Sequence, residues 1–475
     1  MMPTFTRALA AGTLVLAAAC NTDRLVVPNY QNPTPEAIQR DPVAAIPLLA
    51  TGVLRNDRDN HLGFIGGIGI LGREAYNYTS TEGRNTSGWL TSDVNNQASF
   101  GGVSNWSGYY TTLRNIKNLL DLVEGVPDAT VSVARKNAAR GFAHTMEALT
   151  LSYLISFRHN LGIPVEMQEE PAVLSPFVSR DSAYNYILSR LELAKTELTA
   201  GGTAFPFTLH AGFAGFTTPA NFLRFNRAIA ARINAYRASL GVSGCGAARS
   251  AACYNTVLTN LAESFLDPAG ALTTGAFRVY SATANDVANS VSNAATINWV
   301  AHVNSNVGVQ TRSGGGNDLR FQTKILTLAT PKAAANPTIG VTTPWDFTIY
   351  AARETPISII RNEELILLRA EARYYTGDPT GALADINLIR TTAGGLDPVG
   401  AFASEAAFLD ELLYNRRWSL LFEGHRWIDV RRFGRLNTLP LDLPNHITVQ
   451  QLPVPQAECL QRANAPAALR APGCI

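Results

Sequence analysis

The sequence predicts an all-α protein, a tetratricopeptide-like helical-repeat scaffold with long irregular loops and minor β-structure. Many stretches carry apolar residues at helical spacing, and residues 359–390 have the spacing of a tetratricopeptide helix pair. Strand-like fragments such as TKILTLA and FTIYA are short. The 475 residues exceed the usual size of one compact domain. Helical arrays escape that limit, because each repeat buries its apolar face on its neighbour.

Nine segments have the periodicity expected of helices. They are Val43–Leu54, Trp106–Val123, Ala134–Arg158, Ala183–Leu198, Asn221–Leu240, Ala252–Phe265, Ile359–Thr376, Pro379–Arg390 and Glu405–Phe422. Between them lie segments rich in Gly, Asn, Ser and Thr, at residues 63–102, 270–313 and 314–343. Loops of this length are uncommon inside a compact domain and are usually functional.

The helix pair at residues 359–390 is the clearest element. Gly377 is placed to end the first helix, and Asp378 to cap the second. Ala370, Ala382 and Ile386 occupy positions where a tetratricopeptide repeat has small, small and large apolar residues. Small residues there allow two antiparallel helices to approach closely.

The N-terminus predicts export. Ala8–Ala19 is an apolar run too short to span a bilayer, and it fits the core of a signal peptide. It ends in Ala-Ala-Cys, which resembles a bacterial lipobox with Cys20 as the lipidated residue, although Ala17 stands where leucine is usual. The alternative is an ordinary signal peptide cut nearby. We therefore expect a signal peptide at 1–19, a lipidated cysteine with an extended Pro-rich tether at 20–42, and a single helical domain at 43–475.

The cysteines support this interpretation. Of the five, Cys20 is the odd one, and the others form two local pairs, CGAARSAAC and CLQRANAPAALRAPGC. Because an exported protein meets an oxidising compartment, we expect disulfides Cys245–Cys253 and Cys459–Cys474, with free thiols as the alternative. No C-x-x-C spacing is present and no histidine lies near either pair in sequence, so we expect no zinc site.

One stretch, RRWSLLFEGHRWIDVRRFG at Arg416–Gly434, could be a catalytic cluster, a grip on nucleic acid, or architecture. The formal net charge is only +2, which argues against nucleic-acid binding. A catalytic His425–Asp429 pair is the sharper alternative, but no nucleophile is marked beside it. Because an amphipathic helix precedes the stretch, we expect its arginines to hold carbonyls and carboxylates between helices.

The C-terminal third resembles the SusD/RagB family of nutrient-binding outer-membrane lipoproteins. The motifs are IIRNEELILLRAEARYYTGDPTGALADINLIRTTAGG, LLYNRRWSLLFEGHRWIDVRRFG and LPVPQAE, and NWSGYYTTLRNIKNLL resembles an early helix of that family. Ser419 stands where the family commonly has Glu, and Val430 where it has Leu.

The resemblance implies about four tetratricopeptide-like helix pairs, within 43–198, 221–265 and 359–390. It also implies a surface-exposed lipoprotein of the outer membrane. Such a protein captures oligosaccharides, or in some members peptides, and hands them to a SusC-like TonB-dependent transporter without acting on them chemically. No catalytic residue, cofactor or metal ion is expected, and a structural calcium ion is left open.

The loops at 63–102 and 270–346 are the expected ligand-binding regions. Sugar binding needs aromatic rings against the apolar faces of the sugar, with amide and charged groups for its hydroxyls. The alternative is that these rings pin the loops down as small cores. The candidate ligand-binding residues are Tyr76, Tyr78, Arg84, Trp89, Asn95, Asn298, Trp299 and Trp345.

Two other functions are weighed. A secreted helical glycoside hydrolase would need two carboxylates about 5–10 Å apart, and Asp93, Asp346 and Glu354 are imaginable candidates that no spacing singles out. A tetratricopeptide scaffold that binds only proteins should lack loops rich in aromatic residues, which this chain has.

Overall fold

In a computed structural model of the chain, residues 41–91, 94, 106–170, 172–293 and 298–474 are described. Residues Ile46–Ile475 form one compact unit. The predicted signal peptide, Cys20 and nearly all of the predicted tether lie outside the described residues.

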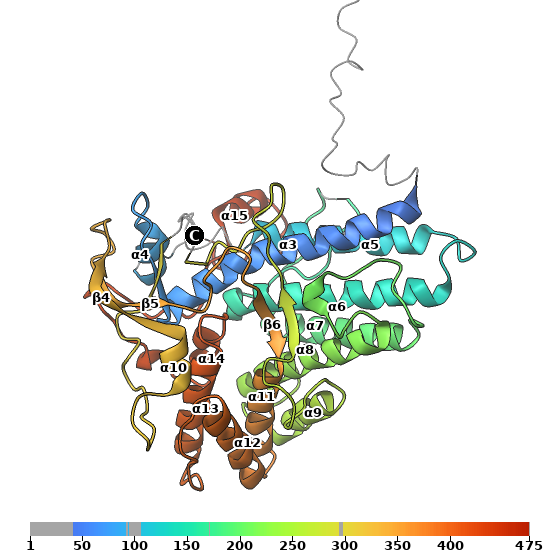
Figure 1. Cartoon of the computed structure of the whole chain (residues 1–475). Helices are drawn as coiled ribbons and strands as arrows, with labels where there is room; N and C mark the ends of the chain where they lie inside the picture. Colours follow the sequence, from blue (N-terminus) through green and yellow to red (C-terminus); the bar gives the residue numbers. More distant parts are fainter. Residues whose placement is uncertain (1–40, 92–93, 95–105, 171, 294–297, 475) are drawn as a thin grey trace, which may run out of the picture. The chain divides into compact units, whose positions relative to one another are not determined.

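Helices dominate the described residues, and each strand is short (Figure 1). The helices are α3 (Pro42–Leu71), α4 (Arg84–Leu90), α5 (Ser107–Gly125), α6 (Val133–Arg158), α7 (Arg180–Thr199), α8 (Pro219–Leu240), α9 (Ala251–Ala262), α10 (Leu319–Lys324), α11 (Asn362–Tyr375), α12 (Pro379–Thr392), α13 (Glu405–Ser419), α14 (Arg426–Arg432) and α15 (Gln456–Arg462). The strands are β1 (Ala75–Asn77), β2 (Gly275–Arg278), β3 (Trp299–Ala301), β4 (Ile325–Ala333), β5 (Thr342–Phe347) and β6 (Ile357–Arg361).

Successive helices pack side by side. Helix α6 lies between α5 and α7, α8 contacts α7 and α9, and α11 contacts α9, α12 and α13 (Figure 1). This arrangement confirms the predicted all-α, tetratricopeptide-like scaffold, and six of the predicted helices match α5 to α9 and α12 closely.

The helix ends follow local sequence signals. The side chains of Ser132, Ser179, Thr218 and Ser404 each accept a backbone N–H in the first turn of α6, α7, α8 and α13. Gly241, with a φ of 70°, ends α8 in the left-handed conformation that glycine adopts readily.

The predicted tetratricopeptide pair is α11 and α12. Ala370, Ala382 and Ile386 are fully buried in one apolar cluster with Phe408 of α13. Asp378 caps α12 by accepting the Gly381 N–H at 2.8 Å. The residues chosen from sequence therefore hold the positions that the repeat requires.

Helix α3 is longer than predicted, because residues 63–71 are helical rather than part of a loop. The glycines in this stretch predict a loop, but in the structure aromatic rings pack directly against them. A Cβ at Gly66 would lie 2.7 Å from the Trp299 ring, and one at Gly67 would lie 2.8 Å from the Trp89 ring. The side chains of these loop residues replace the packing that the glycines lack.

In the described part of the chain the strands form three antiparallel pairs, β1–β3, β2–β6 and β4–β5. The predicted helix Ile359–Thr376 was wrong at its start, since Ile357–Arg361 pair with β2 and α11 begins at Asn362. The burial pattern of β6 explains the error. An apolar run that is buried on both faces cannot be distinguished from a buried helix by periodicity.

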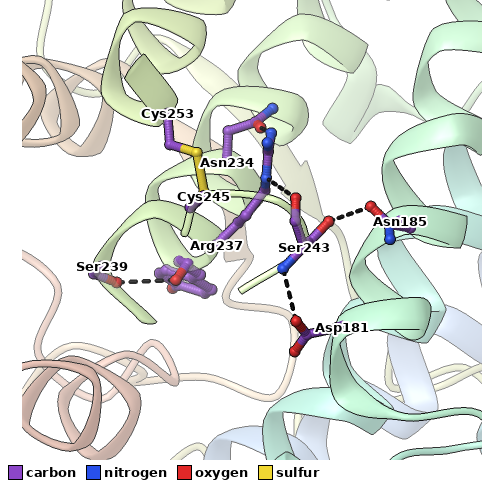
Figure 2. The surroundings of a disulfide bond; sticks show 9 residues. Asp181, Asn185, Asn234, Arg237, Ser239, Ser243, Cys245 and Cys253 are labelled. Atoms are coloured by element: carbon purple, nitrogen blue, oxygen red, sulfur yellow. Dashed lines mark hydrogen bonds between the residues drawn. A yellow bond between two sulfur atoms is a disulfide. The ribbon is translucent and has the colours of Figure 1, made fainter. Parts of the chain in front are cut away.

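Both predicted disulfides are present, Cys245–Cys253 and Cys459–Cys474. Figure 2 shows the first bond near Arg237 and Ser243 in the loop after α8. The Arg237 guanidinium donates to the Ser243 carbonyl at 3.1 Å, and the Ser243 N–H donates to Asp181 of α7 at 3.1 Å. The disulfide thus holds a loop that connects three consecutive helices, α7, α8 and α9.

Replacing both Cys245 and Cys253 by Ala should lower the free energy of unfolding by roughly 2–3 kcal/mol, because the unfolded chain loses a cross-link that closes a short loop. Denaturant-induced unfolding measures this difference, with Asn255→Ala on the exposed face of α9 as the control. A double Cys variant as stable as the control would contradict the prediction.

Candidate functional site

The Arg416–Gly434 segment is architecture. Arg416 donates to the Asp429 carboxylate at 2.7 Å, Arg432 donates to it at 3.0 Å, and all three side chains are buried. Arg432 also grips Glu371 of α11 through two hydrogen bonds, 2.5 and 2.6 Å long. Both oxygens of the Asp429 carboxylate are therefore engaged by guanidinium groups.

His425 and Asp429 have other partners than the catalytic pairing would require. His425 lies with Nε2 3.9 Å from Glu364, and burial lowers its pKa to about 4. Asp429 contacts arginines instead. Trp427 is fully buried, its indole N–H donates to the Val449 carbonyl at 2.7 Å, and the guanidinium of Arg431 lies 4.1 Å from its ring.

The tryptophans expected to face a ligand are mostly buried. Trp89 is 6% exposed and Trp299 is 8% exposed, and both rings pack on glycines of α3. The Trp299 indole N–H donates to the Ser290 carbonyl at 3.2 Å. The expectation that these two rings are presented to solvent is wrong. They pin their loops to α3, so truncating either to Ala should cost stability.

Tyr76 and Tyr78 are also buried, on the strand β1 and just after it. The Tyr76 hydroxyl donates to Asp442, and the Tyr78 hydroxyl donates to the Val341 carbonyl at 2.6 Å. Burial raises the pKa of both phenols. Their expected exposure is also wrong, but Tyr78 still forms a wall of the pocket described next.

A pocket of about 450 Å³ lies where the β1–α4 loop, Asn298 and the end of β4 meet. Its lining is short and mostly uncharged: Tyr78, Thr79, Ser80, Thr81, Asn298, Ala333 and Ala335. We call it the loop pocket. Three consecutive hydroxyl groups and one amide can both donate and accept hydrogen bonds, which suits a neutral polyhydroxyl ligand.

Arg84 is close to the loop pocket in sequence and is exposed at the start of α4. It forms two hydrogen bonds with Glu82, 2.8 and 2.6 Å long. These bonds lower the pKa of Glu82 to about 2. The pair places a carboxylate one residue after Thr81 and a guanidinium group three residues after it.

The two remaining candidate ligand-binding residues, Trp345 and Asn95, are not found at the loop pocket. Trp345 is partly exposed, and its indole N–H donates to the Val303 carbonyl at 3.1 Å, but it does not line the loop pocket. Asn95 lies outside the described residues. Of the predicted residues, the structure brings Tyr78 and Asn298 together at one pocket.

Sequence reasoning missed Thr79, Ser80 and Thr81, which supply most of the polar groups of the loop pocket. The signal was a run of three hydroxyl residues directly after a tyrosine and before Gly83. Aromatic rings are the stronger sequence signal for a sugar site, but they gain free energy by burial, whereas polar hydroxyl side chains more often stay accessible.

A buried polar network supports the strand beside the loop pocket. Asp442 lies 2.8 Å from His302 Nε2, accepts the Asn304 amide at 2.6 Å and accepts the Tyr76 hydroxyl. The Asn304 N–H donates to His302 Nδ1 at 3.1 Å, which places the ring proton on Nε2, facing Asp442. Burial outweighs the carboxylate and lowers the pKa of His302 to about 4.

No group of three or more His, Cys, Asp or Glu in the described ranges is arranged to hold a metal ion. Across the same residues, no helix has both the length and the apolar character needed to cross a membrane.

Known proteins resemble this chain in sequence. The SusD family model, SusD_RagB, matches residues 336–467. A SusD-like protein, P38 of Formosa agariphila, is 33% identical over 89 residues, which cover 17% of this chain and 18% of the relative. The match thus spans less than a fifth of that relative's length.

These matches support a SusD/RagB family protein. The fold of the chain is shared by solved SusD structures over most of their length. A SusD superfamily protein of Bacteroides vulgatus matches with a TM-score of 0.64 and 16% identity, over 91% of this chain and 99% of the other. NanU of B. fragilis matches with a TM-score of 0.62 and 13% identity, over 91% of this chain and 96% of the other.

The pKa of His302 predicts that acid destabilises the folded protein. The unfolded His302 binds a proton below about pH 6.5, whereas the folded residue resists protonation down to about 4, so stability falls as the pH drops between these values. This residue alone should cost on the order of 3 kcal/mol over that window.

His302→Gln keeps a donor for Asp442 but does not titrate. Its free energy of unfolding should fall less than that of the wild type between pH 6.5 and pH 4, as measured by denaturant unfolding. Asn304→Ala loses a bond to the same carboxylate without removing a titrating group, so its cost should be similar at pH 7 and pH 5. Parallel pH profiles of wild type and His302→Gln would contradict the assignment.

Proposed function

We propose that this protein is a cell-surface nutrient-binding lipoprotein that captures an oligosaccharide at the loop pocket. The observation that carries the proposal is the lining of that pocket, in which Thr79, Ser80, Thr81 and Asn298 present neutral hydrogen-bonding groups. Such groups match the alternating donors and acceptors of sugar hydroxyls. The exposed alanines Ala333 and Ala335 add apolar area for sugar ring faces, and the buried Tyr78 supports the wall of the pocket behind them.

Relatives support the class of ligand. One solved neighbour, from B. vulgatus, has a description that includes the words "sugar binding protein". Another has a description that includes "outer membrane protein" and "nutrient binding". Both are under 25% identical to this chain, so they support a ligand class and no particular sugar.

The proposed location and partner are those of the SusD/RagB family, which the chain resembles. The lipobox-like sequence before Cys20 supports a lipid anchor in the outer membrane. In the family such a protein passes its ligand to a SusC-like TonB-dependent transporter, and we extend this role to the chain. Peptides are the second candidate ligand, because some family members take them.

The positions of the candidate carboxylates favour a protein that binds its ligand over a glycoside hydrolase. The Asp346 carboxylate is nearly buried and accepts Lys332 Nζ at 2.5 Å, and Glu354 does not line the loop pocket. Asp93 lies outside the described residues. Among the described lining residues, no carboxylate is placed to act as a general acid.

Glycan titration tests the proposal. Ser80→Ala and Asn298→Ala each remove a polar side chain from the loop pocket, so each should weaken binding about fivefold, equivalent to about 1 kcal/mol for one hydrogen bond. Isothermal titration with hits from a glycan array measures the change, and Asn255→Ala on α9 is the control. Both residues are exposed, so the melting temperature should stay within about 2 °C.

The protein should leave the glycan intact. Release of shorter sugars in the same samples would favour the hydrolase, and a full set of glycans that fails to bind would favour peptides or a scaffold that binds only proteins.

Cys20→Ser tests the anchor. Without the cysteine thiol no lipid can be attached, so the variant should move from the membrane fraction to the soluble fraction of cells that express it. Metabolic labelling with a fatty acid should mark the wild type and not the variant. Unchanged membrane retention of the variant would remove the lipid anchor from the proposal.

A further inference from the structure

The loop pocket lies between two segments that are far apart in the chain. One wall is the β1–α4 loop, which contributes residues 79–81. The other wall includes Ala333 at the end of β4 and Ala335 in the connection between β4 and β5, residues 334–341, which we call the β4–β5 turn. The width of the pocket therefore depends on the contacts that hold this turn against the β1–α4 loop.

Contacts join the two walls near both ends of the β1–α4 loop. Near β1, the buried Tyr78 hydroxyl donates to the Val341 carbonyl at 2.6 Å. Nearer to α4, Asn336 Nδ2 donates to the Ser80 carbonyl at 3.5 Å, and Gly83 lies against the turn. The β1–α4 loop is thus held to the turn on both sides of the residues that line the pocket.

The contact at Gly83 leaves no room for a side chain. A Cβ atom there would lie 1.9 Å from Thr338 Oγ1 and 2.6 Å from Asn336 Oδ1. Both separations are far shorter than a normal van der Waals contact. The backbone does not itself require glycine at this position, because a φ of −67° and a ψ of −23° suit any residue. The close approach of the turn is therefore the physical reason for a glycine here.

The side chain of Asn336 also folds the β4–β5 turn. Its Oδ1 accepts the Thr338 N–H at 3.1 Å and the Thr338 hydroxyl at 2.7 Å. The N–H of Ile339, a residue that is 1% exposed, donates to the Asn336 carbonyl at 3.2 Å. The same Oδ1 atom that orders the turn is thus one of the atoms closest to Gly83. A group that displaced it would disturb the turn as well as the contact.

The α4 side of the contact is held firmly. The Trp89 ring of α4 packs against Gly67 of α3. The buried Thr86 hydroxyl accepts the Asn77 N–H at 2.9 Å and donates to the Asn77 carbonyl at 2.8 Å, which ties α4 to β1. The residues of the turn that lie closest to Gly83 are exposed or partly exposed. A group inserted at Gly83 would therefore displace the turn rather than α4.

We propose that Gly83 is a positioning residue of the loop pocket. Its missing side chain lets the β4–β5 turn approach the β1–α4 loop, and so sets the distance between Ala335 and the hydroxyl groups of residues 79–81. Gly83 does not line the pocket and acts through Asn336 and Thr338, which follow Ala335 by one and three residues. This role rests on the proposed function, because it concerns how an oligosaccharide contacts both walls of the same pocket.

Gly83→Ala tests this role. The added methyl group should push the turn outward, so the affinity for a glycan-array hit that binds the wild type should fall at least about fivefold. Isothermal titration measures the change. Gly125→Ala is the matched control, because it makes the same substitution at an exposed glycine at the end of α5, where a Cβ atom has nothing within 4 Å. Its affinity should stay within about twofold of the wild type.

A second-site rescue separates positioning from a general loss of structure. A background that carries both Asn336→Ala and Thr338→Ala lacks the three atoms that lie closest to the added methyl group. Adding Gly83→Ala to this background should change the affinity for the same glycan by no more than about twofold, relative to the background itself. A loss as large as in the wild type would mean that the methyl group acts on α4 and not through the turn, which would overturn the proposal.

Amide hydrogen exchange tests the same role without any glycan. The Thr338 and Ile339 amides, which are both bonded to Asn336, should exchange faster in Gly83→Ala than in the wild type or in Gly125→Ala. The α4 amides that donate to the residue 83 carbonyl should keep their wild-type exchange rates. Unchanged exchange in the turn would overturn the proposal, whatever the glycan titrations show.

The two proposals fail in different ways. A wild type that binds no glycan contradicts the proposed function, and the exchange rates then still decide whether Gly83 sets the position of the turn. A wild type and a Gly83→Ala variant that bind the same glycan equally well contradict the positioning role alone. Faster exchange in the turn, together with weaker glycan binding that the Asn336→Ala and Thr338→Ala background abolishes, is the result expected from the structure.

Discussion

The fold depends on arginine–carboxylate pairs that are buried between the C-terminal segment and the repeat helices. Arg432 joins Glu371 of α11 to Asp429 of α14, and Arg232 of α8 grips Glu364 of α11 at 2.5 and 2.6 Å. Such a pair adds little net stability over apolar residues, but removing one partner leaves a buried charge and costs several kcal/mol. The bonds of Arg432 to Glu371 and of Arg416 to Asp429 hold α14 on α11 and α13, and the Arg232–Glu364 pair holds α8 on α11.

The helical framework determines which side chains of the loops are buried and which remain accessible. Helix α3 presents Gly66 and Gly67 to the Trp299 and Trp89 rings, so the two loops that carry these rings are anchored at defined points. The largest apolar groups of each loop are used for anchoring. The groups that remain available to a ligand are the smaller polar ones, of which Asn298 is an example. The loop aromatics thus position the loop pocket, and the hydroxyl and amide groups line it.

Sequence alone predicted most of the scaffold, because helix periodicity and capping residues act locally. It predicted both disulfides for the same reason, since each pair closes a short loop. It failed where distant residues decide the outcome. Residues 63–71 look like a loop until Trp299 and Trp89 supply the packing that their glycines lack, and Ile357–Arg361 reads as helix until β2 pairs with it. The burial of Tyr76 depends on Asp442, which is 366 residues away in the sequence.

Buried hydrogen bonds behind the loop pocket hold its walls in place, and this preorganisation favours binding. Behind Tyr78, the Tyr76 hydroxyl and His302 converge on Asp442, so β1 and β3 are joined by hydrogen bonds that do not involve the ligand. Binding then has fewer side chains and backbone segments to order, and ordering a rotamer-rich side chain costs about 0.5–1.5 kcal/mol. The short side chains of Thr79 to Thr81 lower this cost further, because they have few rotamers to lose. If the loop pocket takes a sugar as proposed, a site made of small polar groups on an anchored loop needs only weak contacts to bind it, since little of the interaction energy is spent on ordering the protein.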